Sequence, residues 1–401
     1  GCQEDLTTPG ACPALCPGNS IIVRDTVIEA VAAGDTAYVG YTTRADRQLL
    51  LVSSGLAAGE YRSFVVFGKT TRDSVVVDGT SRPFTIDTAA ISFRIEARDT
   101  LVKGLRLYLF RIPITTDSTI SYAGLTDLLT PANLIDSIRV SDTLKTGRVE
   151  VAITGDSLAA FFPPASDSGR VGIGVALAAD QATGVSLALD RFSLNGSGPL
   201  LEYRGVAEGV VDTTKRRQRI QVRQENIGTG TTIPRAGFVT NTDLAANRDR
   251  DLLYVGGPSA ARSLLRFSVP SFVRDTAQIV RATLLLTPAQ PLAGLPNTVV
   301  TDFVSALGLV VDLGAKSPTV SAGAAPRGVL KEGTTGEIAI DVFSLVAQWQ
   351  TEGGAPQSIF LVHSEEIAGG FMQPIFRSTR SATGRPRLRI TYGLPVKPGQ
   401  P

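Results

Sequence analysis

The chain has 401 residues, with 39 Lys and Arg against 37 Asp and Glu, so its net charge of +2 excludes a strong overall field for attracting a highly charged partner. Hydrophobic residues make up 43%, which suits a globular protein of about two domains, and no stretch of about 18 apolar residues could span a membrane as a helix. The abundance of Val, Thr, Ser and Gly, with one Met, one Trp and one His, is typical of strands and turns rather than helices.

All three cysteines lie within the first sixteen residues. Cys2 follows Gly1 and precedes a polar stretch rich in Pro, Gly and Thr. This resembles the processing point of a bacterial lipoprotein, so we expect Cys2 to carry lipid and residues 1–19 to form a flexible tether. The alternative is an unpaired cysteine in a secreted tail.

Cys12 and Cys16 are close enough to form a small disulfide loop, which would suit an oxidising compartment outside the cytoplasm. A metal site would need two further soft ligands, and the only histidine is His363. We therefore expect an exported protein, anchored by lipid at the outer membrane, on the cell surface or in the periplasm.

After residue 19 the chain alternates between short apolar runs and turn-forming stretches such as DGTSRP, GGPS and ATGRP. Period-2 alternation or short apolar runs predict strands at 63–67, 91–96, 105–110, 148–153 and 171–177. Helical spacing interrupts this pattern twice, in GDSLAAFF (155–162) and in DVFSLVAQWQ (341–350). In the second, Asp341 can cap a helix whose apolar face carries Val342, Leu345, Val346 and Trp349.

The second half of the sequence repeats the first. Ala37–Phe67 matches Gly237–Phe267 at an offset of 200, and the later blocks follow in the same order in both halves. The pattern predicts an all-β fold of two tandem jelly-roll-like β-sandwiches, each with one short helix. We assign residues 20–205 to sandwich 1, 206–218 to a linker, 219–393 to sandwich 2 and 394–401 to a tail.

Five segments of the second half form a characteristic series: RSLLRFSVPS (262–271), IVRATLLL (279–286), IAIDVFSLVAQW (338–349), IFLVHS (359–364) and FRSTRSATGRPRLRITY (376–392). Residues 219–393 thereby resemble the DNRLRE-type domains of bacterial secreted proteins, which are related to a carbohydrate-binding module family. The first half lacks the Trp and the RP-x-L ending, so its membership rests on the internal repeat. The resemblance implies a β-sandwich found beside secreted enzymes and adhesins, of which some relatives bind anionic polysaccharide, and it does not imply catalysis.

Residue types needed for catalysis are scarce. Nucleophilic triads usually need a histidine base, and the single His363 lies in a predicted strand without evident partners. No GxSxG, phosphate-binding or dinucleotide motif is present, although paired acids for glycoside cleavage cannot be recognised from one sequence. We therefore expect no enzymatic activity. The paucity of aromatic residues for base stacking argues against nucleic acid.

Two residue groups could bind a ligand. Arginines gather near the C-terminus, and three of them recur at every second position of RPRLRI, on one face of a strand, where they could bind carboxylates, sulfates or phosphates. The alternative is a solvated face that protects an edge strand. The group consists of Arg377, Arg380, Arg385, Arg387 and Arg389.

The other group lies in NTDLAANRDRD, where oxygen donors alternate as in a calcium loop. The pattern predicts calcium as a cofactor. The alternative is a solvated turn, because the loop lacks the glycine of an EF-hand and contains two arginines. The donors are Asn241, Asp243, Asn247, Asp249 and Asp251.

The half from residue 206 onward carries 21 Lys and Arg against 15 Asp and Glu, so it is the basic half. These features predict an extracellular or envelope protein that acts as a surface binding module for glycans or envelope polymers. The alternative is a structural or assembly protein, such as an adhesin or an accessory subunit of an outer-membrane complex or filament. The expected partners are an anionic polysaccharide or an envelope protein, with the membrane reached through the N-terminal lipid.

Overall fold

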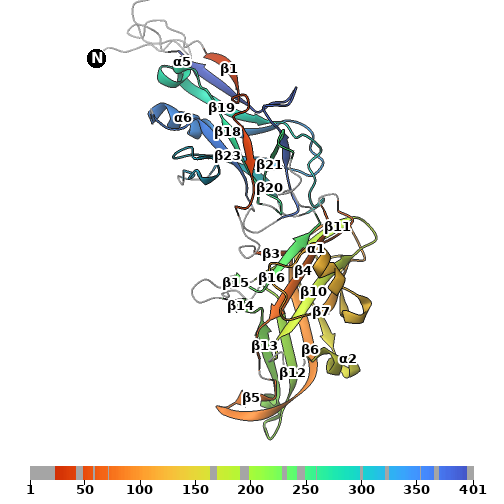
Figure 1. The fold of residues 1–401 in the computed structure, drawn as a ribbon. Helices are drawn as coiled ribbons and strands as arrows, with labels where there is room; N and C mark the ends of the chain where they lie inside the picture. Colours follow the sequence, from red (N-terminus) through yellow and green to blue (C-terminus); the bar gives the residue numbers. More distant parts are fainter. Residues whose placement is uncertain are drawn as a thin grey trace, which may run out of the picture.

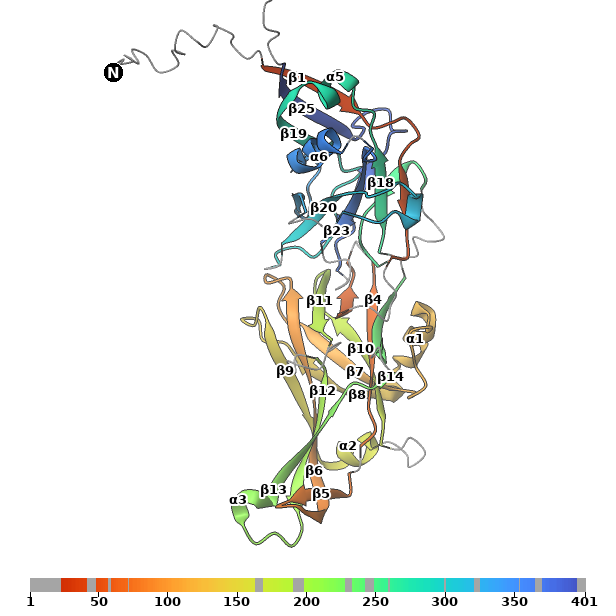
Figure 2. The same ribbon diagram turned by 90° about the vertical axis from the view of Figure 1, so that its left-hand side faces the viewer.

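The computed structural model is predominantly β, with 49% strand and 12% helix in several antiparallel sheets, which confirms the all-β prediction. Figures 1 and 2 show two β-rich lobes placed end to end. We call the described residues between 48 and 241 lobe 1, and the described residues between 23 and 41 together with those between 249 and 394 lobe 2. The structure describes residues 23–41, 48–56, 59–70, 72–162, 169–189, 198–227, 233–241, 249–258, 260–298, 301–320, 325–352, 354–364 and 370–394.

Lobe 1 contains two sheets that share one core. Inward side chains from both sheets, such as Val65 and Ile91, are buried together. One sheet has the order β16 (Ala236–Thr240), β4 (Tyr61–Phe67), β10 (Val171–Ala178), β7 (Arg106–Ile112), β8 (Leu134–Arg139). The other has the order β13 (Arg217–Arg223), β12 (Leu200–Ala207), β6 (Thr80–Arg98), β11 (Thr183–Ala188), β3 (Leu49–Ser54), with β5 (Ser74–Val77) and β9 (Gly147–Ile153) also paired to β6.

Lobe 2 is built in the same way, with Leu265 and Leu361 from one sheet packed against Leu284 and Ile390 from the other. One sheet has the order β2 (Thr36–Tyr38), β18 (Arg262–Arg266), β23 (Ser358–His363), β20 (Asp302–Gly308), β21 (Arg327–Leu330). The other has the order β1 (Val23–Glu29), β25 (Arg387–Gly393), β19 (Gln278–Leu286), β22 (Ile338–Asp341). Two short ladders lie outside these sheets: β17 (Leu252–Tyr254) with β24 (Ile375–Arg377) in lobe 2, and β14 (Asn226–Ile227) with β15 (Ile233–Pro234) in lobe 1.

The helix expected near Trp349 forms as α6 (Phe343–Thr351), and the Asp341 carboxylate accepts a hydrogen bond from the Phe343 N–H at 3.0 Å. Its apolar face is buried, as the spacing predicts. The expectation of one helix per half understates the number, because lobe 1 contains α1 (Tyr122–Leu128), α2 (Gly155–Phe161) and α3 (Thr213–Arg216), and lobe 2 adds α5 (Ser271–Asp275). Single 3-10 turns occupy Pro131–Asn133 and Gly314–Lys316.

The strand pairing differs from the predicted domain boundaries. The predicted linker 206–218 is part of lobe 1, where β12 and β13 form an antiparallel pair, and β16 pairs with β4. Conversely, β1 pairs with β25 and β2 with β18, so residues 23–38 belong to lobe 2 rather than to a first sandwich. The repeat identifies similar segments, but it does not say which copy a strand pairs with, because strand pairing is non-local.

The two lobes nevertheless have the same strand order. Read across the sheets, β16-β4-β10-β7-β8 corresponds to β2-β18-β23-β20-β21, and β13-β12-β6-β9 corresponds to β1-β25-β19-β22. A local detail agrees: buried Ser63 on β4 and buried Ser263 on β18 each donate a hydrogen bond to a backbone carbonyl, of Leu51 and Tyr254 respectively. Each lobe is thus completed by the two strands that begin the other sequence repeat.

The lobes meet through an apolar cluster. Phe371 of lobe 2 packs edge-on against Tyr61 of lobe 1, with ring centroids 5.2 Å apart. The Thr100 hydroxyl donates a hydrogen bond to the Asn297 carbonyl at 2.8 Å across the same boundary. The cluster consists of Leu51, Leu56, Tyr61, Ala97 and Phe238 from lobe 1 with Leu295 and Phe371 from lobe 2.

Candidate functional site

Two of the five arginines predicted to bind a ligand lie on the strand β25 and point outward. On β25, exposed Arg387 and Arg389 alternate with buried Leu388 and Ile390, as period-2 geometry requires. Arg385 stands just before the strand and donates a hydrogen bond to the Ser381 carbonyl at 2.8 Å. The sequence pattern therefore placed Arg387 and Arg389 correctly on the outer face of a strand, whereas Arg385, expected on the same strand, lies just before it.

Each of these arginines faces an acidic side chain of the same chain. Arg387 lies 2.7 Å from the carboxylate of Glu337, which precedes β22. Arg389 lies 2.5 Å from Asp25, and Arg385 lies 3.3 Å from Glu29, both on the neighbouring strand β1. These three arginines and the acids Asp25, Glu29 and Glu337 therefore form a ladder of paired charges, which we call the charge ladder, rather than a set of free cations.

The Asp25 carboxylate is the most strongly engaged member of the ladder. It accepts hydrogen bonds from Arg389 at 2.5 Å and from the Thr391 hydroxyl at 2.6 Å. Hydrogen bonding to Arg389, and then to Thr391, lowers the pKa of the Asp25 carboxyl below its ordinary value. Asp25 therefore stays ionised, and its charge offsets that of Arg389, at neutral and mildly acidic pH.

The other two predicted arginines have different surroundings. Arg377 on β24 donates a hydrogen bond to the Thr383 hydroxyl at 2.9 Å. Arg380 reaches Asp35, whose side chain is fully buried, at 3.2 Å, and it also donates to the Arg250 carbonyl at 3.3 Å. The five arginines thus divide between the charge ladder, a local turn and a buried ion pair.

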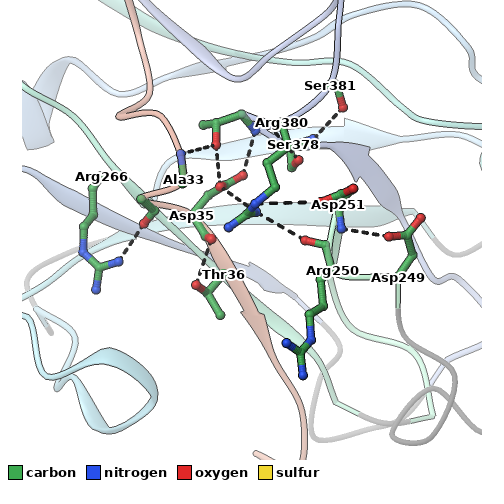
Figure 3. Close-up of polar contacts among 12 residues, drawn as sticks. Ala33, Asp35, Thr36, Asp249, Arg250, Asp251, Arg266, Ser378, Arg380 and Ser381 are labelled. Atoms are coloured by element: carbon green, nitrogen blue, oxygen red, sulfur yellow. Dashed lines mark hydrogen bonds and ion pairs between the residues drawn. The ribbon is translucent and has the colours of Figure 1, made fainter.

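Figure 3 shows the surroundings of Asp35, which no sequence motif marked. The carboxylate accepts hydrogen bonds from the Thr379 N–H at 2.8 Å and from the Thr379 hydroxyl at 2.5 Å, in addition to Arg380. Thr379 in turn accepts a hydrogen bond from the Ala33 N–H at 3.1 Å. This network ties the segment between β1 and β2 to the loop before β25.

A small cavity of about 270 Å³ opens beside this ion pair. Asp35 and Asp251, which lie 3.2 Å and 3.7 Å from Arg380, supply negative charge next to its guanidinium group. The cavity is too small for a polysaccharide chain, and its charges are largely balanced by the protein itself. Its lining residues are Asp35, Thr36, Ala37, Arg250, Leu252 and Arg380.

The donors proposed for calcium are occupied by contacts within the protein where the structure describes them. The side-chain oxygen of Asn241 accepts from the Glu60 N–H at 3.0 Å, and the Asp249 carboxylate accepts from the Asp251 N–H at 2.8 Å. Asp243 and Asn247 lie outside the described residues. Within the described ranges, no cluster of three or more His, Cys, Asp or Glu side chains could hold a metal ion, and a bound calcium ion remains an untested prediction.

The predicted cysteines, tether and most of the tail lie outside the described residues, whereas His363 lies within them. Cys2, Cys12 and Cys16 lie outside the described residues, as do tether 1–19 and all of the tail except Leu394. His363 is buried, with its Nε2 3.3 Å from the Asp302 carboxylate, in the strand where the sequence placed it.

None of the helices in the described part of the chain has the length and apolar character needed to cross a membrane.

A sequence signal for the charge ladder did exist. Asp25, Val27 and Glu29 alternate along β1 with the same period of two as the arginines on β25, and acids facing a basic strand are the expected complement. Comparison with known proteins gave no matching family and no matching curated protein. The resemblance to DNRLRE-type domains therefore stays a prediction from the five segments.

Proposed function

We propose that the protein is a non-catalytic structural or assembly protein of the cell envelope, exported and held at the membrane through Cys2. The observation that favours this role over glycan binding is the charge ladder, in which Asp25, Glu29 and Glu337 form ion pairs with the three arginines on and next to β25. We also propose that each lobe is a jelly-roll-like β-sandwich, which the shared strand order of the lobes supports.

The position of β1 gives this proposal a definite orientation. In Figures 1 and 2, β1 lies at the end of lobe 2 farthest from lobe 1, whereas the β5–β6 and β12–β13 hairpins form the opposite end of the molecule. A chain held through residues before Val23 would therefore place lobe 2 beside the membrane. Lobe 1 would extend outward, although most of its sequence precedes most of that of lobe 2.

This orientation predicts different distances from the membrane for two exposed valines. Val211, which is 97% exposed, lies between β12 and β13 at the outer end of lobe 1, and Val280 lies on β19 near β1. In the lipidated chain carrying Cys12→Ser and Cys16→Ser, a donor dye on Val280→Cys should transfer energy efficiently to acceptor lipids in vesicles. The same dye on Val211→Cys should transfer far less, and equal transfer from both positions would overturn the orientation.

The anchor itself is tested with the matched change Cys2→Ser. The variant should fold normally by circular dichroism but leave the membrane fraction. Continued sedimentation with membranes after a high-salt wash would show that attachment does not depend on Cys2.

Glycan binding is the second candidate, because Arg385, Arg387 and Arg389 do share one outward face. Because each arginine is paired with an acid, we expect the full chain to elute from an anionic polysaccharide gel at low salt. Screening adds to this effect, since the Debye length is about 10 Å at 0.1 M salt. Changing all three arginines to Gln should alter elution little and should leave the protein folded, because exposed ion pairs add little to stability. Retention at high salt that the triple variant loses would restore the glycan-binding function.

A further inference from the structure

The two strands that begin the chain complete the lobe farther along the sequence. We call residues 23–41, which contain β1 and β2, the N-terminal arm. In lobe 1 the equivalent strands β13 and β16 follow their own lobe directly, but in lobe 2 they come from more than 200 positions earlier. Lobe 2 is therefore complete only when a segment from the start of a chain occupies the edges of β25 and β18.

The arm is bound to lobe 2 by both backbone and side-chain contacts. β1 pairs in register with β25 along its whole length, and β2 pairs with β18. Side chains add the ion pairs of Asp25 and Glu29 and the buried Asp35 network. Arg266 donates a hydrogen bond to the Gly34 carbonyl at 2.6 Å, so the segment between the two strands is also fixed to lobe 2.

The arm contacts lobe 2, but the chain that follows it leads into lobe 1. After Tyr41 the chain passes through residues 42–47, which lie outside the described ranges, and enters lobe 1 at β3. The body of lobe 2 is joined to lobe 1 separately, through residues 242–248. An arm that leaves its own lobe 2 would thus leave both lobes connected, with two sheet edges of lobe 2 unpaired and the core positions of Ile28 and Ala30 unfilled.

We infer that the N-terminal arm of one copy also completes lobe 2 of a second copy, so that the protein assembles with itself by exchange of residues 23–41. The exchanged form contains the same strand pairs and ion pairs as the closed form, so the two differ mainly in chain entropy and concentration. Reciprocal exchange gives a dimer, and successive exchange gives a head-to-tail chain of copies.

This inference deepens the proposed assembly role by identifying the partner as a second copy of the chain. Its test uses the full-length chain with Cys2→Ser, Cys12→Ser and Cys16→Ser, so it is independent of membrane attachment. Failure of self-assembly would then leave the anchor proposal standing, and failure of the anchor would leave arm exchange standing.

The experiment uses two single-cysteine chains. Val27 on β1 lies directly opposite Arg389 on β25, so one chain carries Val27→Cys and the other carries Arg389→Cys. The two chains are incubated together at high concentration and then oxidised. A disulfide-linked heterodimer joining these positions forms readily only where the arm of one copy lies in lobe 2 of the other.

The control replaces Val27→Cys with Val76→Cys, which is at least as accessible (67% against 54% exposed) but lies on β5 of lobe 1. We expect several-fold more heterodimer from the Val27 and Arg389 pair than from the control pair, and a yield that rises with concentration. Equal yields would overturn the inference. The chain that retains both Val27 and Arg389 provides a second measurement, because a mass in sedimentation equilibrium that stays monomeric at every concentration would also overturn it.

Discussion

Replacing Asp35 with alanine should destabilise lobe 2 by about 3 kcal/mol. The change removes a fully buried carboxylate and leaves the Thr379 N–H, the Thr379 hydroxyl and Arg380 without their acceptor. Arg380 is 35% exposed and can regain water, which places the loss at the lower end of the range for a broken buried pair. Urea unfolding monitored by the fluorescence of Trp349, the only Trp of the chain, reports on lobe 2 alone.

The matched control is Asp25→Ala, which removes another carboxylate of the same arm. Asp25 and Arg389 form an exposed pair, so this change should lower the stability of lobe 2 far less than Asp35→Ala does. An equal loss in the free energy of unfolding for both variants would mean that the burial of Asp35 does not stabilise the contact between the N-terminal residues 23–41 and the rest of lobe 2.

Replacing Phe371 with alanine should weaken the contact between the lobes by about 3–5 kcal/mol, the usual cost of removing a buried Phe side chain. Phe371 is 4% exposed, and its ring lies against Tyr61 and the backbone of Gly184 in lobe 1. Small-angle X-ray scattering should then show a broader distribution of overall lengths, because the lobes are no longer held in one orientation.

Gly184 provides an independent variant of the same contact. A Cβ at this position would approach the Phe371 ring to 2.7 Å, so Gly184→Val should displace the ring and give a similar scattering profile. Phe272→Ala is the control, because Phe272 is 43% exposed and lies on α5, at the far end of lobe 2. An unchanged profile for both Phe371→Ala and Gly184→Val would show that the apolar cluster does not fix the lobes.

The sequence by itself determined the local structure of this protein. Alternation of apolar residues predicted the strands now seen as β4, β7 and β10, since one face of each must be buried. The spacing around Trp349 predicted a helix with a buried face, and the period of two in RPRLRI placed Arg387 and Arg389 outward on β25. These features depend on neighbours a few residues apart, which the sequence shows directly.

Only the tertiary structure decided which strands pair and which charges meet. β1 and β13 begin the two matching repeats, and the backbone hydrogen bonds of an antiparallel ladder are the same for any strand, so the repeat alone does not say which lobe each strand completes. The pairing of β1 with β25 brings Asp25 and Glu29 to the arginines and buries Asp35 beside Arg380, from positions more than 340 residues apart. Such contacts depend on long-range packing and loop closure, so the composition of either segment alone could not reveal that Arg385 and Arg389 form ion pairs with the start of the chain.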